Sequence, residues 1–175
     1  MGDERPAVPA ALRIASISIL AAVTTVLTIV VRVPTPAKGY INFEDVAIVF
    51  TALTLGPVSG MLAGGLGTAV SDILSGFANF APISLVVHGL QGLLVGLVVR
   101  IRPSSLWLQI VAGVVGTVVM VGGYFAAEAL FVSGIGPALA EVPLNLIQAG
   151  VGVVLGILVS AAVLRAYPPV RQWRW

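Results

Sequence analysis

Long apolar stretches, separated by short segments rich in proline, glycine and charge, make up most of this 175-residue chain. An apolar α-helix of about 20 residues is the element that crosses the hydrocarbon core of a bilayer. We therefore predict an all-α polytopic membrane protein with six helices, over Ala11–Val31, Asp45–Leu55, Val58–Ser75, Ala81–Val99, Leu106–Val132 and Val142–Leu164. The second stretch is short for a full crossing, so we expect it to be tilted, sheltered by the other helices, or re-entrant.

Proline and glycine predict where these helices end, because proline cannot continue a helix. Gly56-Pro57 closes the second helix, and Gly134–Pro137 breaks the chain after the fifth. We expect one membrane domain over residues 1–175, with short solvated tails at 1–10 and 166–175. The longest outer loop is predicted at Arg32–Phe43.

The composition agrees with a membrane protein. The chain is 58% hydrophobic and 9% charged, whereas soluble domains are about 25% charged. So few charges cannot cover a soluble surface, which excludes a soluble globular enzyme and a disordered linker. A net charge of +2, with the basic residues scattered, also excludes a nucleic-acid-binding patch. There is no cysteine, so the chain holds no disulfide, thiol nucleophile or cysteine-based metal site.

The basic residues predict the orientation, because arginine and lysine concentrate in cytoplasmic segments. With a cytoplasmic N-terminus, seven of the nine basic residues fall on the inner side, namely Arg5, Arg13, Arg100, Arg102, Arg165, Arg171 and Arg174. Only Arg32 and Lys38 fall outside. We therefore expect both termini to be cytoplasmic, with Trp173 and Trp175 either anchored at the inner interface or in a disordered tail.

Polar residues within the predicted helices gather in their outer halves. His88 and Gln91, and likewise Asn145 and Gln148, are three residues apart and share a helix face. Tyr124 and Glu128 are four apart and do the same. Lipid penalises such stripes and a shared pocket satisfies them. We therefore predict a cavity open to the outside above an apolar floor, with ligand-binding candidates Asn42, Asn79, His88, Tyr124, Glu128, Asn145 and Gln148.

Each candidate also has a purely structural explanation. The amides can join helices, His88 can bond a neighbouring carbonyl, and Glu128 can be ionised at the headgroup boundary. Asn79 is a residue typical of turns. Asp45 and Asp72 are open to the same two interpretations, because each can contact a ligand or be a charge at a helix boundary. The lone histidine has no partner at metal-ligand spacing, so we predict neither a metal site nor a cofactor.

Small residues at steps of three or four form the other pattern. The stripe that includes Gly60, Gly64 and Gly67, and the pair Gly152 and Gly156, predict close helix packing inside the bundle. Alanines on the first helix make one smooth face opposite a large aliphatic one. That helix is a candidate for docking a partner protein, through Ala11, Ala15 and Ala22.

Several motifs are absent from the sequence. No GxxxxGK[ST] phosphate loop occurs, so the chain does not hydrolyse ATP by that chemistry. No GxSxG motif or Ser-His-Asp set indicates covalent catalysis. A pocket without an energy source implies either passive passage or an energised partner.

Taken in order, the loop and helix-end motifs resemble the S components of energy-coupling factor (ECF) vitamin transporters. The resemblance covers about Ala11–Leu164 and rests on Pro34-x-Pro36-x-x-Gly39-Tyr40-Ile41-Asn42-x-x-Asp45, Leu55-Gly56-Pro57-x-x-Gly60, Ser71-Asp72-x-x-Ser75-Gly76, His88-Gly89-x-Gln91-Gly92, Gly123-Tyr124-Phe125-x-x-Glu128 and Pro143-x-Asn145-x-x-Gln148-x-Gly150. The set is most similar to the branch for hydroxymethylpyrimidine, thiamine-type or pyridoxine-like ligands.

The resemblance implies a mechanism. Such proteins bind a vitamin at the outer face of a bacterial or archaeal cell membrane, under the loop between the first two helices. They associate with a membrane T component and two ATPases and tilt to deliver the ligand inward. The family pattern places partner contact on the alanine face of the first helix and ligand contact on the loop and outer helix ends.

Two other classes stay open on the residues alone. One is a small integral-membrane enzyme acting on a lipid or prenyl substrate, with Glu128 or His88 as general base. The other is a structural membrane scaffold. The leading hypothesis is a vitamin-binding subunit that is not an enzyme.

Overall fold

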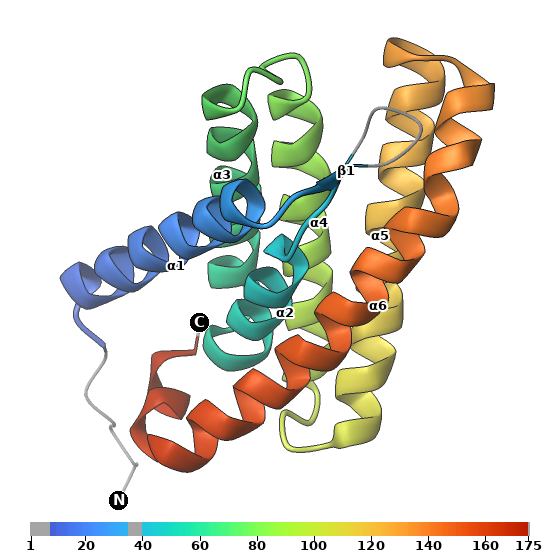
Figure 1. The fold of residues 1–175 in the computed structure, drawn as a ribbon. Helices are drawn as coiled ribbons and strands as arrows, with labels where there is room; N and C mark the ends of the chain where they lie inside the picture. Colours follow the sequence, from blue (N-terminus) through green and yellow to red (C-terminus); the bar gives the residue numbers. More distant parts are fainter. Residues whose placement is uncertain (1–7, 35–39, 175) are drawn as a thin grey trace, which may run out of the picture.

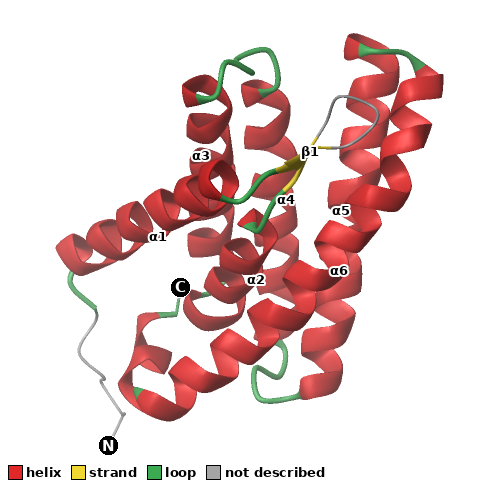
Figure 2. Cartoon of the chain, viewed as in Figure 1, coloured by secondary structure: helices red, strands yellow, loops and turns green. Residues whose placement is uncertain are grey.

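The computed structural model describes residues 8–34 and 40–174 of the chain, and most of them are helical (Figure 1 and Figure 2). The elements in chain order are α1 (Ala10–Val30), β1 (Val33–Pro34), β2 (Tyr40–Ile41), α2 (Glu44–Leu55), α3 (Pro57–Leu74), α4 (Ala81–Arg100), α5 (Leu106–Ala127), η1 (Glu128–Val132), α6 (Ile135–Ala166) and η2 (Pro168–Trp173). η1 is a π-helix that continues α5, and η2 is a 3-10 helix.

Four of these helices are long and apolar enough to cross a membrane: α1, α4, the run from Leu106 to Val132, and α6. Their side chains face outward over much of their length, as lipid-facing helices do. The structure thus agrees with a helical, multi-pass membrane protein.

The short helix α2 lies in the middle of the bundle, where it packs against α1, α3, α4 and α6 (Figure 1). Ten of its 12 residues are buried. At 1.5 Å per residue it rises about 18 Å, well short of the roughly 30 Å hydrocarbon core. The prediction that this stretch is sheltered by other helices is confirmed, and shelter explains how a short helix that begins with two acidic residues is tolerated here.

Close helix contacts depend on the predicted glycine stripes. A Cβ added at Gly92 of α4 would lie 2.3 Å from the carbonyl oxygen of Gly60 on α3, and one at Gly67 would lie 2.7 Å from Thr24 of α1. On α6, a Cβ at Gly152 would lie 2.2 Å from Cβ of Asp45. Distances this short exclude any side chain, so the prediction of internal packing for these glycines is confirmed.

The predicted start of the sixth helix, Val142, is wrong. α6 begins at Ile135 and continues through Pro143. Gly134, with φ of +84°, is the residue that turns the chain. Pro137 does not break the helix because it lies in the first turn, where a backbone N–H has no partner within the helix. The added residues, Ile135 to Glu141, carry Glu141 to the end of the bundle where the first loop, between α1 and α2, lies.

The predicted outer loop contains a short antiparallel hairpin in which Val33 pairs with Ile41 and Pro34 with Tyr40. Residues 1–7 of the predicted N-terminal tail, residues 35–39 of this loop, and Trp175 lie outside the described residues. At the other end, η2 turns back under the bundle and buries Val170. There Arg174 donates hydrogen bonds to the carbonyl oxygens of Leu53 and Thr54, which end α2.

Candidate functional site

A cavity of about 400 Å³ opens between the first loop, the turn from α3 to α4, and the facing ends of α5 and α6. Pockets for small ligands have volumes of about 300–1,000 Å³, so this one suits a small molecule. Its described lining residues are Tyr40, Asn42, Glu44, Asp72, Phe77, Asn79, Phe80, Ser84, Met120, Tyr124, Glu128, Val132, Ser133, Pro137, Glu141, Asn145 and Gln148.

Six of the seven ligand-binding candidates predicted from the sequence line this cavity. Asn42 comes from the first loop and Asn79 from the turn between α3 and α4, and the other four come from α5, η1 and α6. His88 is placed differently. Its side chain is completely buried and lies beneath the cavity, with its ring centroid 5.3 Å from that of Tyr124. The partner-docking candidates Ala11, Ala15 and Ala22 are exposed on α1, away from the cavity.

One wall of the cavity is a chain of hydroxyls that ends on Asp72. The hydroxyl of Ser84 donates to Asp72 Oδ2 at 2.5 Å, so its oxygen is left to accept from the Tyr124 hydroxyl, 2.6 Å away. Tyr40 donates to the other carboxylate oxygen at 3.4 Å. Burial, reinforced by the negative charge of Asp72, raises the pKa of Tyr40 well above its ordinary value. Tyr40 therefore stays a neutral donor that ties the first loop to α3.

Aromatic rings flank the same wall. Tyr40 and Phe77 lie with centroids 5.6 Å apart and planes tilted by 54°. The Arg32 guanidinium stands 4.7 Å from the Tyr40 ring centroid and also bonds Ser75. The arrangement leaves flat apolar faces next to hydrogen-bonding groups, which is the environment that a planar heteroaromatic ligand requires.

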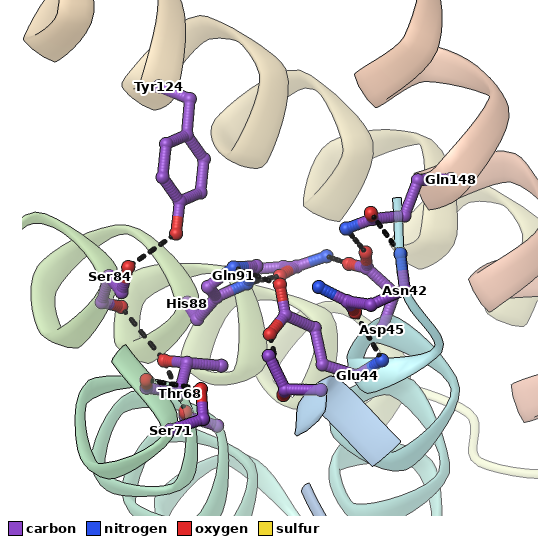
Figure 3. A network of polar contacts seen from close by, with 12 residues as sticks. Asn42, Glu44, Asp45, Thr68, Ser71, Ser84, His88, Gln91, Tyr124 and Gln148 are labelled. Carbon is purple, nitrogen blue, oxygen red and sulfur yellow. Dashed lines mark hydrogen bonds and ion pairs between the residues drawn. The ribbon is translucent and has the colours of Figure 1, made fainter. Parts of the chain in front are cut away.

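The floor of the cavity is a buried polar network, shown in Figure 3. Gln148 accepts from the backbone N–H of Asn42 at 2.9 Å and donates to Asp45 Oδ2 at 2.8 Å. Glu44, which lines the cavity, forms an ion pair with His88 at 3.0 Å. The expected apolar floor lies one layer deeper, in a core cluster that includes Val49, Leu53 and Val95.

The charge of the lining is one-sided. Four carboxylates face the cavity, from Glu44, Asp72, Glu128 and Glu141, and none of the described lining residues is basic. Glu44 has the imidazole of His88 below it. Glu128 is partly buried and has Glu141 as its charged neighbour. The described lining is therefore rich in carboxyl groups.

Four acidic residues at the cavity or in its floor are absent from the ligand-binding candidates predicted from the sequence. Glu44 and Glu141 are not among the predicted candidates, because Glu44 lies just before a predicted helix and Glu141 lies in a predicted loop. Asp45 and Asp72 lie at predicted helix boundaries, where a carboxylate also has a structural explanation. A signal for Glu44 was present, because two adjacent carboxylates opening a sheltered helix require buried partners.

Comparison with known proteins agrees with this geometry. The profile described as "ECF-type riboflavin transporter, S component" matches residues 10–165. The chain belongs to the family of ECF-type S components. It is therefore the substrate-binding subunit of a transporter for a vitamin or vitamin precursor, and the family implies an ATP-driven partner module.

Two curated relatives extend the match. The thiamine precursor transporter HmpT of Lactococcus lactis subsp. cremoris is 32% identical over 152 residues, which cover 83% of this chain and 86% of that protein. An uncharacterized protein of Pyrococcus woesei is 38% identical over 134 residues, which cover 75% of this chain and 88% of that protein. The resemblance drawn from the loop and helix-end motifs is thereby confirmed.

Proposed function

We propose that this S component captures a small nitrogen heteroaromatic of the hydroxymethylpyrimidine, thiamine or pyridoxine type. The observation that carries the proposal is the lining, with aromatic rings and four carboxylates and no basic group among its described residues. Carboxylates bind ring amino groups and protonated ring nitrogens through charge-assisted hydrogen bonds, and attract a quaternary ring cation through its charge. The relative whose name gives a thiamine precursor supports the same ligand class.

Within this proposal Glu128 and Asn145 hold the ligand from the side of α5 and α6, while Asn42 and Gln148 bond it from below. Tyr124 supplies a ring face and a hydroxyl. Riboflavin, which the family profile names, carries a neutral ring system and is a poorer match to an acidic lining. The ligand leaves unchanged, because the proposed role is binding and delivery and not catalysis.

Mass spectrometry of the ligand retained after mild purification tests the ligand class. We expect an unaltered aminopyrimidine, thiamine or pyridoxine in a 1:1 ratio. Retained riboflavin would refute the ligand class, and a converted product would refute the binding role. The variant Glu128→Gln, which keeps the shape and removes the charge, should weaken binding of thiamine, a fixed cation, by about tenfold and binding of a neutral pyrimidine less.

We further propose that α1 to α6 form a six-helix bundle in the cell membrane of a bacterium or archaeon. Both termini lie in the cytoplasm, and the cavity faces outside. The ends of α4, α6 and η2 opposite the cavity, together with the residues that directly follow them, carry Arg100, Arg102, Arg165, Arg171 and Arg174, which supports this orientation. Because the chain has no cysteine, single variants report position directly. Ser133→Cys should react with an impermeant thiol reagent on intact cells, and Ser104→Cys only after permeabilisation. The reverse pattern would contradict the orientation.

The partner surface is proposed on the exposed alanine face of α1, which the family pattern assigns to a T component joined to two ATPases. Ala15→Trp should abolish uptake in proteoliposomes holding the full complex while leaving ligand binding intact. Val118→Trp, on an exposed face of α5, is the matched control and should leave both unchanged. Equal loss of uptake in both variants would argue against a specific surface.

A further inference from the structure

His88, the only histidine in the chain, lies at the junction of α4 with α2 and α5, is fully buried, and is not among the described residues that line the cavity. We propose that His88 is doubly protonated and acts as a positioning residue that keeps the first loop packed against the bundle. It would act through its neighbours, since Glu44 and Tyr124 stand between it and the cavity. This role does not depend on which ligand the cavity binds.

The contacts around His88 form a closed ring. Five hydrogen bonds of 2.7, 2.5, 2.8, 2.9 and 2.7 Å link the members in turn, two of them donated by the backbone N–H groups of Asn42 and Glu44. An ion-pair contact of 3.0 Å between Glu44 and His88 closes the ring. In order, the ring consists of His88, Gln91, Asp45, Gln148, Asn42 and Glu44. All six side chains are at most 8% exposed. Figure 3 shows these side chains facing one another. The ring joins α4, α2, α6 and the base of the first loop.

The donors and acceptors in this ring fix each other's direction. The backbone N–H of Asn42 is only a donor, so the Gln148 oxygen must accept from it and the Gln148 amide nitrogen points to Asp45. Asp45 also accepts from the amide nitrogen of Gln91. The Gln91 oxygen is then left facing His88 Nδ1, which must carry a proton.

The second ring nitrogen, Nε2, faces the carboxylate oxygen of Glu44 at 3.0 Å. The titratable groups around the imidazole are Glu44 and Asp45 on α2, Asp72 on α3 and Tyr124 on α5, and no described arginine or lysine joins the ring. Two buried carboxylates beside one imidazole favour a proton on both nitrogens, because each unpaired buried charge is costly. The imidazolium thus balances part of the charge that α2 brings into the bundle.

The loop is the element that this arrangement positions. Asn42 is held twice, through its backbone N–H on Gln148 and through its side-chain oxygen, which accepts from the backbone N–H of Glu44 at 2.7 Å. If His88 loses its charge, Nδ1 keeps its proton for Gln91, and Nε2 no longer offers one to Glu44. Glu44 is then less firmly held, which relaxes the constraint that its backbone N–H places on Asn42. The first loop, which carries Tyr40 to the cavity wall, should then open more often.

Nuclear magnetic resonance of the full chain labelled with ¹⁵N-histidine, purified without a histidine tag, reads this state directly because it gives a single imidazole. We expect both ring nitrogens to be protonated at neutral pH, and Glu44→Gln to convert the ring to one neutral tautomer. A neutral ring in the wild-type chain would overturn the proposal.

The effect on the loop is measured with Ile41→Cys in the cysteine-free chain. Its thiol reactivity should rise at least about threefold when Glu44→Gln and His88→Gln are combined, a pair that removes the charge without leaving a charged orphan. Ser104→Cys, in the turn after α4, is the control and should not change. Unchanged reactivity at position 41 would refute the positioning role. Should that pair not fold, the same comparison is made with Glu44→Gln alone. Neither readout uses a ligand, so a chain that binds no vitamin would refute the proposed function and leave this inference standing.

Discussion

Replacing Gly152 by alanine tests the contact on which the cavity floor depends. The added Cβ would lie 2.2 Å from Cβ of Asp45 and 3.1 Å from its carbonyl carbon. Carbon atoms pack at about 3.5–4.0 Å, so α6 and α2 must separate by about 1 Å or more. Both helices contribute to the cavity floor here, because Asp45 of α2 accepts a hydrogen bond at 2.8 Å from Gln148, which lies one turn before Gly152 on α6.

Overpacking of this kind costs about 1–3 kcal/mol, which corresponds to about a 5- to 150-fold change in an equilibrium constant. We expect Gly152→Ala to lower the thermal unfolding midpoint in detergent and to weaken ligand binding at least about fivefold. Binding weakens because separation of α6 from α2 lengthens the hydrogen bonds that Gln148 makes with Asp45 and with Asn42. Calorimetric titration of each variant measures the affinity.

Gly150 is the matched control, since it lies two residues away on α6 and an added Cβ there meets nothing within 4 Å. Gly150→Ala should keep the affinity and gain up to about 1 kcal/mol of helix stability. If Gly152→Ala binds and unfolds like the wild-type chain, the close approach of α6 to Asp45 is wrong.

Three further predictions concern the wall, the base of α2 and the loop. Tyr124→Phe removes the hydroxyl that bonds Ser84 and keeps the ring, so affinity should fall about two- to tenfold by titration calorimetry; an unchanged affinity would exclude a role for the hydroxyl. Arg174→Gln removes a charged donor from the last carbonyl groups of α2 and should cost about 1 kcal/mol of stability in thermal unfolding with ligand affinity kept; a loss of affinity would show that the tail reaches the site. Burial raises the pKa of Tyr40, so its phenol ionises more readily in the unfolded chain and stability should fall as the pH rises above about 10. Thermal unfolding of Tyr40→Phe should lack this part of the fall. Identical pH profiles for the two chains would contradict the burial of Tyr40.

The sequence predicts the helices well where a single physical cause dominates. Lipid requires long apolar runs, so α1, α4 and α5 are predicted within one or two residues at their starts. Prolines are less informative: Pro137 and Pro143 both lie within α6, because a first turn tolerates proline and a helix supported by neighbours tolerates one inside.

The cavity was predictable as a region and not as a set of contacts. Helical spacing places Asn145 with Gln148 and Tyr124 with Glu128, and depth places both pairs near the first loop. Spacing cannot show that Glu44 pairs with His88 across two helices, because that contact depends on how deep α2 sits. Nor can it separate the wall from the layer beneath, which is why His88 was predicted as a ligand contact and lies under the cavity.

The central claim is that the cavity between the first loop and the ends of α5 and α6 is where the vitamin binds. Titration calorimetry on Asn145→Leu tests it most directly, because this variant removes an amide from the lining at similar volume. The control is Gln109→Leu, since the Gln109 amide bonds the Pro103 carbonyl near the opposite end of α5. We predict that Asn145→Leu weakens binding about tenfold or more while Gln109→Leu binds like the wild-type chain. Equal affinities for the two variants would contradict the claim.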